Sequence, residues 1–284
     1  ANDTSPDALF INQGDGTFED VAEYARTADA RGSMGVGVGD YDGDLDQDIW
    51  VTHWIAQDDA LFRNMSEKYP GGEVRFVDDI AYAVGEHSLS YVGWGVGFLD
   101  YDNDGWLDVY VANGSMFEDP EDRTRLRTMK NLLFRNQGGR RFILANDAVG
   151  EAWSNQNVGR GASFADYDND GDQDILVLSR GEGVRLLQNQ GGNERNWLTL
   201  DLKGTPGNVQ AVGAMVIIGA GGEKQMRDVV AGSSYLSMND TRLHFGLGQN
   251  ELVDSVEIRW PDEEIQRLEG VEANQIMTVS QGAR

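Results

Sequence analysis

The feature that most constrains the fold of this chain is a nine-residue acidic segment that occurs three times. Its copies span residues 40–48, 100–108 and 166–174, and each places aspartate at positions 1, 3, 5 and 9. Each copy follows a glycine-rich apolar lead and runs into a short segment rich in β-branched and aromatic residues. The pattern predicts two strands joined by an acidic loop, repeated three times.

A second motif alternates with the first. It reads Leu-Phe-x-Asn at residues 9–12, 61–64 and 133–136, with a weaker copy at 186–189. The first three copies are followed by glycine and then by a strand-like phenylalanine, which is typical of a hairpin. One repeat therefore holds about four short strands, and the spacing favours the blades of a β-propeller over a sandwich. We expect an all-β chain.

Three blades do not close a propeller, which typically needs about 4 to 8. In the register of the repeat, residue 1 corresponds to residue 112, just after a strand in the middle of a blade. We therefore expect N-terminal blades to be missing from this chain, or a partner chain to supply them. Helical periodicity occurs only in residues 118–130, where 125–129 predicts a short helix.

The acidic segments predict calcium sites. Oxygen donors at alternate positions, with glycine at position 6 for a sharp turn, are how a loop wraps Ca²⁺, and position 7 normally contributes its backbone carbonyl. Magnesium prefers fewer protein carboxylates, and zinc prefers nitrogen or sulfur donors, which do not recur here. We expect about three ions, weakest in the first loop, where Leu45 replaces glycine. The predicted ligands are Asp40, Asp42, Asp44, Asp46, Asp48, Asp100, Asp102, Asp104, Trp106, Asp108, Asp166, Asp168, Asp170, Asp172 and Asp174.

Charge and composition narrow the partners and the compartment. The chain has 23 basic against 48 acidic residues, a net charge of -25, which argues against binding to nucleic acid or anionic membranes. It has no cysteine, which excludes disulfides and thiolate metal sites. No apolar run is long enough for a membrane helix, so we expect no membrane insertion. Calcium at unshielded loops indicates an extracellular setting, secreted, at the cell surface or periplasmic.

The composition changes near the glycine-rich residues 191–194. Residues 1–194 carry most of the negative charge, whereas 195–284 are nearly balanced. We therefore predict blades in 1–194 and a separate β domain in 195–284. Seven strand patterns without helices predict a small antiparallel sandwich or barrel there. They lie at 197–202, 213–218, 225–230, 243–247, 255–260, 265–268 and 276–279.

At this point the motifs carry a family resemblance. The Asp-x-Asp-x-Asp-Gly-x-x-Asp loops after Gly-x-Gly leads resemble the FG-GAP (VCBS) repeats of calcium-binding β-propellers. The C-terminal part resembles the ASPIC/UnbV domain at residues 196–198, 211–214, 231–237, 243–248 and 256–261. Together the two modules resemble the cartilage acidic protein-like family. The resemblance implies a secreted protein that joins a propeller to an ASPIC/UnbV domain.

The chain shows no convincing catalytic set. His53 and His87 suit an acid–base or metal pair only if they share a propeller face, and His244 lies in a strand pattern that favours packing. The loop 233–237 is read as an ordered turn that packs Tyr235, with ligand contact as the alternative.

The sequence is compatible with three functions. We favour a non-catalytic adhesion or interaction protein whose calcium-stiffened propeller binds a protein or polysaccharide. The alternatives are a calcium-assisted polysaccharide lyase or hydrolase with His53 or His87 as base, and a structural subunit of an extracellular assembly.

Overall fold

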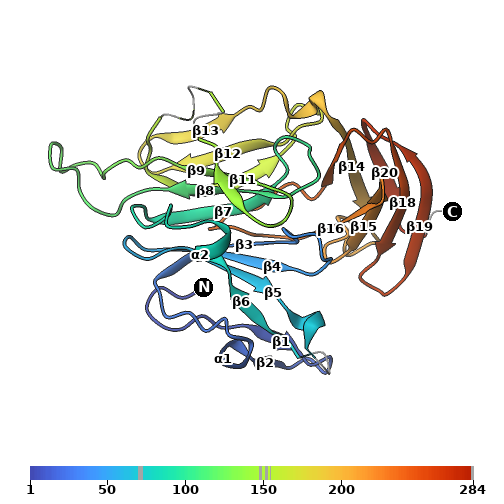
Figure 1. The fold of residues 1–284 in the computed structure, drawn as a ribbon, viewed down its shortest axis with the longest axis horizontal. Helices are drawn as coiled ribbons and strands as arrows, with labels where there is room; N and C mark the ends of the chain where they lie inside the picture. Colours follow the sequence, from blue (N-terminus) through green and yellow to red (C-terminus); the bar gives the residue numbers. More distant parts are fainter. Residues whose placement is uncertain (70–72, 147–148, 151–152, 154, 283–284) are drawn as a thin grey trace.

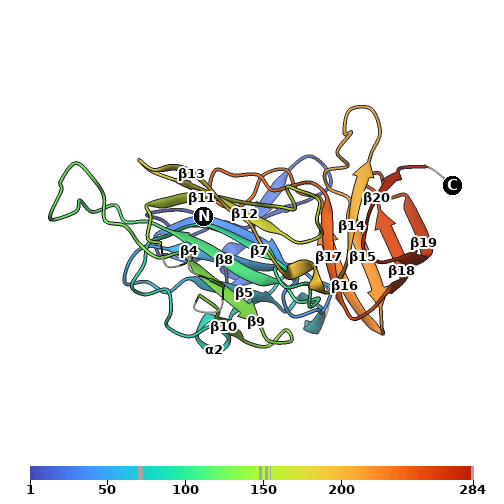
Figure 2. The same cartoon turned by 90° about the horizontal axis from the view of Figure 1, so that it is seen from above.

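The computed structural model describes residues 1–284 except 70–72, 147–148, 151–152, 154 and 283–284. Strands dominate it, and the prediction of an all-β chain built from propeller-like blades is confirmed (Figure 1). Three sheets stack side by side, and a second, two-sheet unit lies against one end of the stack in both views (Figures 1 and 2). The three sheets do not close into a ring.

The stacked sheets are the predicted blades. Blade 1 has the antiparallel order β3 (Ser33–Gly39), β4 (Asp48–His53), β5 (Ala60–Asn64) and β6 (Phe76–Asp78). Blade 2 repeats it with β7 (Gly93–Leu99), β8 (Asp108–Asn113), β9 (Leu132–Asn136) and β10 (Phe142–Leu144). Blade 3 has three strands, β11 (Gly159–Ala165), β12 (Asp174–Ser179) and β13 (Gly183–Leu187). Each acidic segment joins the first strand of a blade to the second. We call these connections loop 1, loop 2 and loop 3.

The hairpins predicted from the second motif are confirmed. They are β1 (Phe10–Asn12) with β2 (Phe18–Asp20), β5 with β6, and β9 with β10. Short helices lie at α1 (Ala22–Ala25) and α2 (Ile80–Ala83), with single 3-10 turns at Ser66–Lys68 and Gly192–Glu194.

The helix predicted at residues 125–129 is wrong. The segment belongs to an excursion that projects from blade 2 (Figures 1 and 2) and closes on itself through a bridge between Glu118 and Leu126. The amide of Arg127 donates to the carbonyl of Phe117. Because its residues are mostly exposed, no packed face supports the helix, and an isolated helix this short is unstable in water.

Aromatic side chains and glycines pack against each other where neighbouring blades meet. Trp50 of β4 is fully buried and lies 5.5 Å from the ring of Phe134 in blade 2. Tyr110, at the equivalent place in β8, lies 6.0 Å from Phe164 in blade 3. A Cβ added at Gly97 would lie 2.2 Å from the ring of Phe164. The glycine-rich leads are therefore explained by close approach of the innermost strands.

Residues 196–280 form the C-terminal unit. Its two sheets have the orders β17-β14-β20 and β16-β15-β18-β19 and enclose a core that includes Leu198, Phe245 and Trp260. The strands are β14 (Asn196–Lys203), β15 (Met215–Ala220), β16 (Glu223–Asp228), β17 (Leu243–Gly248), β18 (Leu252–Arg259), β19 (Ile265–Glu272) and β20 (Gln275–Ser280).

The expectation of a purely antiparallel unit is wrong at one place. β14 and β20 pair in parallel, from Leu198 opposite Gln275 to Lys203 opposite Ser280. A parallel pair needs a long crossover, and here the chain passes through all four strands of the facing sheet and through β17 between β14 and β20.

Candidate metal sites facing the C-terminal unit

The three acidic loops lie at the end of the blades that faces the C-terminal unit (Figure 1). Each loop makes the same turn. The aspartate at position 1 accepts two backbone N–H bonds, from positions 4 and 6 in loop 1 and from positions 5 and 6 in loops 2 and 3. Positions 4 and 6 adopt left-handed φ values: Gly43, Asn103 and Asn169 at position 4, and Leu45, Gly105 and Gly171 at position 6. The glycine that the motif requires at position 6 thus has a conformational cause.

The aspartate at position 9 of each loop accepts a hydrogen bond at each of its two carboxylate oxygens. One oxygen of Asp108 accepts from the amide of Tyr101 at 3.2 Å, and the other from the amide of Asn136 at 2.8 Å. Asp48 and Asp174 repeat this arrangement, with Asn64 and Asn189 donating at 2.8 Å. Each donating asparagine is the last residue of the second motif.

The second motif therefore belongs to the sites, which the sequence analysis missed. Its third residue contacts the aspartate at position 3 of the loop: Arg135 lies 2.8 Å from Asp102, and Gln188 donates to Asp168 at 2.8 Å. In blade 1 Arg63 lies 3.8 Å from Asp42. The distance along the chain from the aspartate to the asparagine varies, at 16, 28 and 15 residues, so the only signal in the sequence was that the two motifs alternate.

In every loop the carboxylates of positions 1, 3 and 9 converge. Their oxygens lie within 4.8 Å of one another in the sets Asp40, Asp42, Asp48; Asp100, Asp102, Asp108; and Asp166, Asp168, Asp174. The position-5 aspartates Asp44, Asp104 and Asp170 lie outside these sets and accept the amide of position 7 instead. The carbonyl ligands predicted at Asp46, Trp106 and Asp172 stay a prediction.

The buried carboxylates fit a hard divalent cation. One oxygen each of Asp42, Asp46, Asp102 and Asp172 is buried without a hydrogen-bond partner. Burial raises the pKa of Asp48 to about 9 and the pKa of Asp100 to about 7, and neighbouring carboxylates add to both shifts. A divalent ion with oxygen ligands removes this penalty, since it supplies positive charge and fills the free lone pairs.

The histidines do not form an exposed acid–base pair. His53 is buried, with Nδ1 2.7 Å from the carbonyl of Asp58, and burial lowers its pKa. His87 is exposed and packs on Phe134 at 6.1 Å between ring centroids. His244 is buried in β17, as expected.

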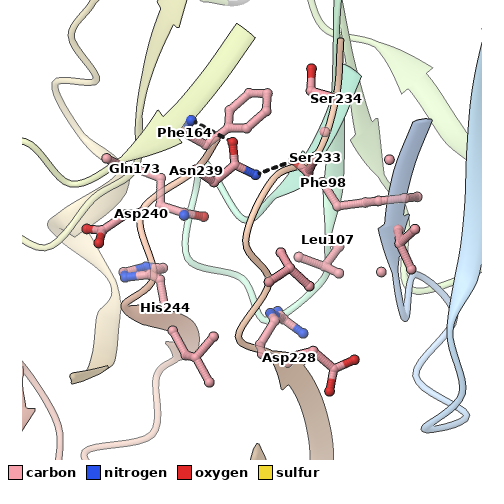
Figure 3. Close-up of a pocket in the computed structure, with 18 of the residues that line it drawn as sticks. Phe98, Leu107, Phe164, Gln173, Asp228, Ser233, Ser234, Asn239, Asp240 and His244 are labelled. Carbon is pink, nitrogen blue, oxygen red and sulfur yellow. Dashed lines mark hydrogen bonds between the residues drawn. The ribbon is translucent and has the colours of Figure 1, made fainter. Parts of the chain in front are cut away.

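A cavity of about 400 Å³ lies between the innermost blade strands and the C-terminal unit (Figure 3). Asn239 bridges it by accepting from the amide of Phe164 at 3.2 Å and donating to Ser233 at 3.0 Å. The neighbouring turn packs Tyr235 against Trp94, with ring centroids 4.9 Å apart. This segment therefore crosses the inner edges of the blades as an ordered turn.

In the part of the chain that the structure describes, no helix is long and apolar enough to cross a membrane.

Comparisons with known proteins match both units. An FG-GAP-like repeat model matches residues 1–51 and 100–177, and an ASPIC and UnbV model matches residues 204–284. Cartilage acidic protein 1 is 31% identical over 278 residues in Xenopus tropicalis and 31% identical over 267 residues in Homo sapiens, covering 93% and 92% of this chain. The chain spans about two fifths of the length of these relatives, 39% and 38%. The predicted resemblance is confirmed.

Proposed function

We propose that this chain, which carries FG-GAP-like repeats followed by an ASPIC and UnbV domain, is an extracellular, calcium-binding, non-catalytic interaction protein. The observation that supports this best is the threefold repetition of one carboxylate cluster with the same backbone bonds. If the three acidic segments were only solvated turns, nothing would require their carboxylates to converge in the same way. The ions act mainly as structural staples, because each one offsets repulsion among buried carboxylates at a strand junction.

The setting is proposed to be extracellular. Loops that use calcium as a structural ion suit a medium rich in that ion. The relatives carry the name cartilage acidic protein 1, and this chain is likewise acidic, with a net charge of -25.

Binding of a protein or polysaccharide is favoured over catalysis. A calcium-assisted lyase needs an exposed base beside a charge-stabilising group. His53 is buried with a lowered pKa, and exposed His87 lies in a different environment.

The test is a calorimetric calcium titration of chelator-stripped protein, with thermal melts alongside. We expect about three ions and a clear rise in melting temperature. At 100 times the dissociation constant, each site adds about 2.7 kcal/mol. Asp108→Asn should remove one ion, whereas the control Asp254→Asn, on an exposed part of β18, should remove none. Absence of binding, or binding without stabilisation, would overturn the proposal.

A second candidate is a structural subunit, and one surface favours it. Leu176, Leu178, Val184 and Leu186 project from one face of blade 3, where Leu176 pairs with Leu186 and Leu178 with Val184. All four are exposed. The residues equivalent to Leu176 in the other blades, Trp50 and Tyr110, are fully buried by the next blade. A further blade, from the same or another chain, is proposed to cover this face.

A further inference from the structure

All three acidic loops contact the C-terminal unit directly. In loop 1 Gln47 donates to Asp228. In loop 2 the ring of His244 lies 2.7 Å from Oδ1 of Asn103, whose carbonyl accepts from the amide of Gly248 at 2.9 Å.

Loop 3 is held by one arginine of the C-terminal unit. The guanidinium of Arg242 donates to Oδ1 of Asn169 at 2.5 Å and to the carbonyl of Asp166 at 2.6 Å. Asn169 and Asn103 both occupy position 4 of their loops. The C-terminal unit therefore contacts, in loops 2 and 3, the turn that carries the predicted ligands.

The contact is tight at the ligands themselves. A Cβ at Gly246 of β17 would lie 2.1 Å from Oδ2 of Asp100, the first predicted ligand of loop 2. A Cβ at Gly171 of loop 3 would lie 2.0 Å from the ring of Trp197 in β14. Neither surface leaves room for the other to move closer, so a loop that expands toward the C-terminal unit displaces it.

A cation of the C-terminal unit lies among the loops. Arg227 lines the cavity of Figure 3 and also a second cavity that it shares with Asp40 and Asp104. Its guanidinium donates to the carbonyl of Met226 at 2.8 Å and to Gln225 at 3.2 Å. It places positive charge beside the carboxylates of two loops without binding them tightly.

The loops are also bonded to one another. Asn136 of β9 donates to the carbonyls of Tyr41 in loop 1 and Leu107 in loop 2 and so joins these two loops. Asn103 of loop 2 donates to the carbonyl of Gly171 in loop 3. Loops and C-terminal unit thus form one continuous polar layer.

We propose that metal binding by the three loops and docking of the C-terminal unit on the blades are thermodynamically coupled, with His244 and Arg242 as positioning residues for loops 2 and 3. The inference rests on the proposed metal binding. An empty loop leaves crowded carboxylates that rearrange to separate their charges, which displaces Asn103 and Asn169 from their partners. A filled loop fixes both asparagines. By linkage, docking then raises metal affinity by the same factor as the metal favours docking.

The first test uses calcium titration of the whole chain. Arg242→Gln should bind three ions but hold one of them about 5- to 150-fold more weakly, the usual range for coupled sites. The matched control is Arg259→Gln, because Arg259 pairs with Glu257 on an exposed part of β18. It should leave all affinities unchanged.

The second test follows amide hydrogen exchange in the unmodified chain, with and without calcium. The amide of Gly248 should exchange at least about tenfold faster without calcium because its acceptor, the carbonyl of Asn103, moves. The amide of Val216, inside the C-terminal core, should stay protected and show that this unit remains folded.

The outcomes separate the two proposals. Failure to bind any ion overturns both. Three ions that bind with unchanged affinity in Arg242→Gln, together with calcium-independent exchange at Gly248, overturn the coupling and leave the calcium sites standing.

Discussion

At the residue scale, the residue at position 6 decides how much backbone strain each acidic loop carries. Gly105 and Gly171 adopt φ values of 94° and 96° without a Cβ penalty, whereas Leu45 adopts 68° at the same position. Left-handed backbone costs a non-glycine residue about 1–2 kcal/mol. Loop 1 closes in spite of this strain because its first aspartate still accepts both backbone amides.

Replacing Leu45 with glycine should therefore stabilise the chain by about 1 kcal/mol and strengthen calcium binding at one site. Urea unfolding and calcium titration measure the two effects. The control Glu263→Gly removes similar strain (φ 70°) at an exposed turn and should change stability without changing calcium affinity. A loss of stability in Leu45→Gly would show that side-chain packing outweighs the strain.

A buried carboxylate outside the loops sets a pH dependence. Asp59 accepts from Nε1 of Trp50 at 3.1 Å and from the amide of His53 at 3.1 Å. Burial raises its pKa to about 7, although these bonds favour the ionised form. The folded state then holds a proton that the unfolded chain releases near its ordinary pKa. The stability this proton provides is complete below that value and is lost as pH rises through about 7.

In calcium-saturated protein, the stability of the Asp59→Asn variant should fall less than that of the parent as the pH rises. The variant loses one acceptor, so it should be less stable than the parent at pH 5 by about 1 kcal/mol. The deficit should shrink or reverse at pH 8, where the parent must ionise Asp59. Chemical denaturation at both pH values measures the difference. A deficit that grows with pH would contradict the raised pKa.

At the element scale, strand pairs act as the frame for the sites. The third strand of each blade leads to an asparagine whose amide donates to the aspartate at position 9, so this strand and the loop form one unit. The innermost strands pack closely enough that glycine is required where they cross.

Gly95→Ala should cost about 1–3 kcal/mol. The new Cβ would lie 2.6 Å from the amide nitrogen of Ala162 and 2.7 Å from the carbonyl of Arg160, and backbone cannot move aside as a flexible side chain can. Gly191→Ala is the control, since nothing lies within 4 Å of its Cβ position. Equal stability of the two variants in urea would show that the blades separate without cost.

At the scale of the whole molecule, the uncovered apolar face of blade 3 is the surface where we expect a partner to bind. Its four apolar side chains form two cross-strand pairs, whereas most exposed apolar residues occur singly. A chain with this face uncovered should associate as its concentration rises.

The double variant Leu178→Thr with Val184→Thr should reduce that association, which sedimentation velocity measures across a concentration series. Threonine preserves strand propensity, so the sheet should remain. Val209→Thr, an exposed apolar residue outside this face, should leave association unchanged. Association that persists in the double variant would place the contact elsewhere.

The sequence alone determined the parts of this protein whose causes are local. A left-handed turn needs glycine, an oxygen-rich loop needs alternate aspartates, and a strand needs period-two apolar residues, so blades and hairpins were predictable. Of the carboxylates expected to converge at positions 1, 3, 5 and 9, those at 1, 3 and 9 do so, and that at 5 lies outside the cluster. Only the tertiary structure decided what depends on residues far apart in the chain. Long-range packing decided three features: the parallel pairing of β14 with β20, the hydrogen bond from the second motif to the aspartate at position 9, and the contact of His244 with Asn103. No local pattern encodes such contacts, because many different partners satisfy the same buried polar group.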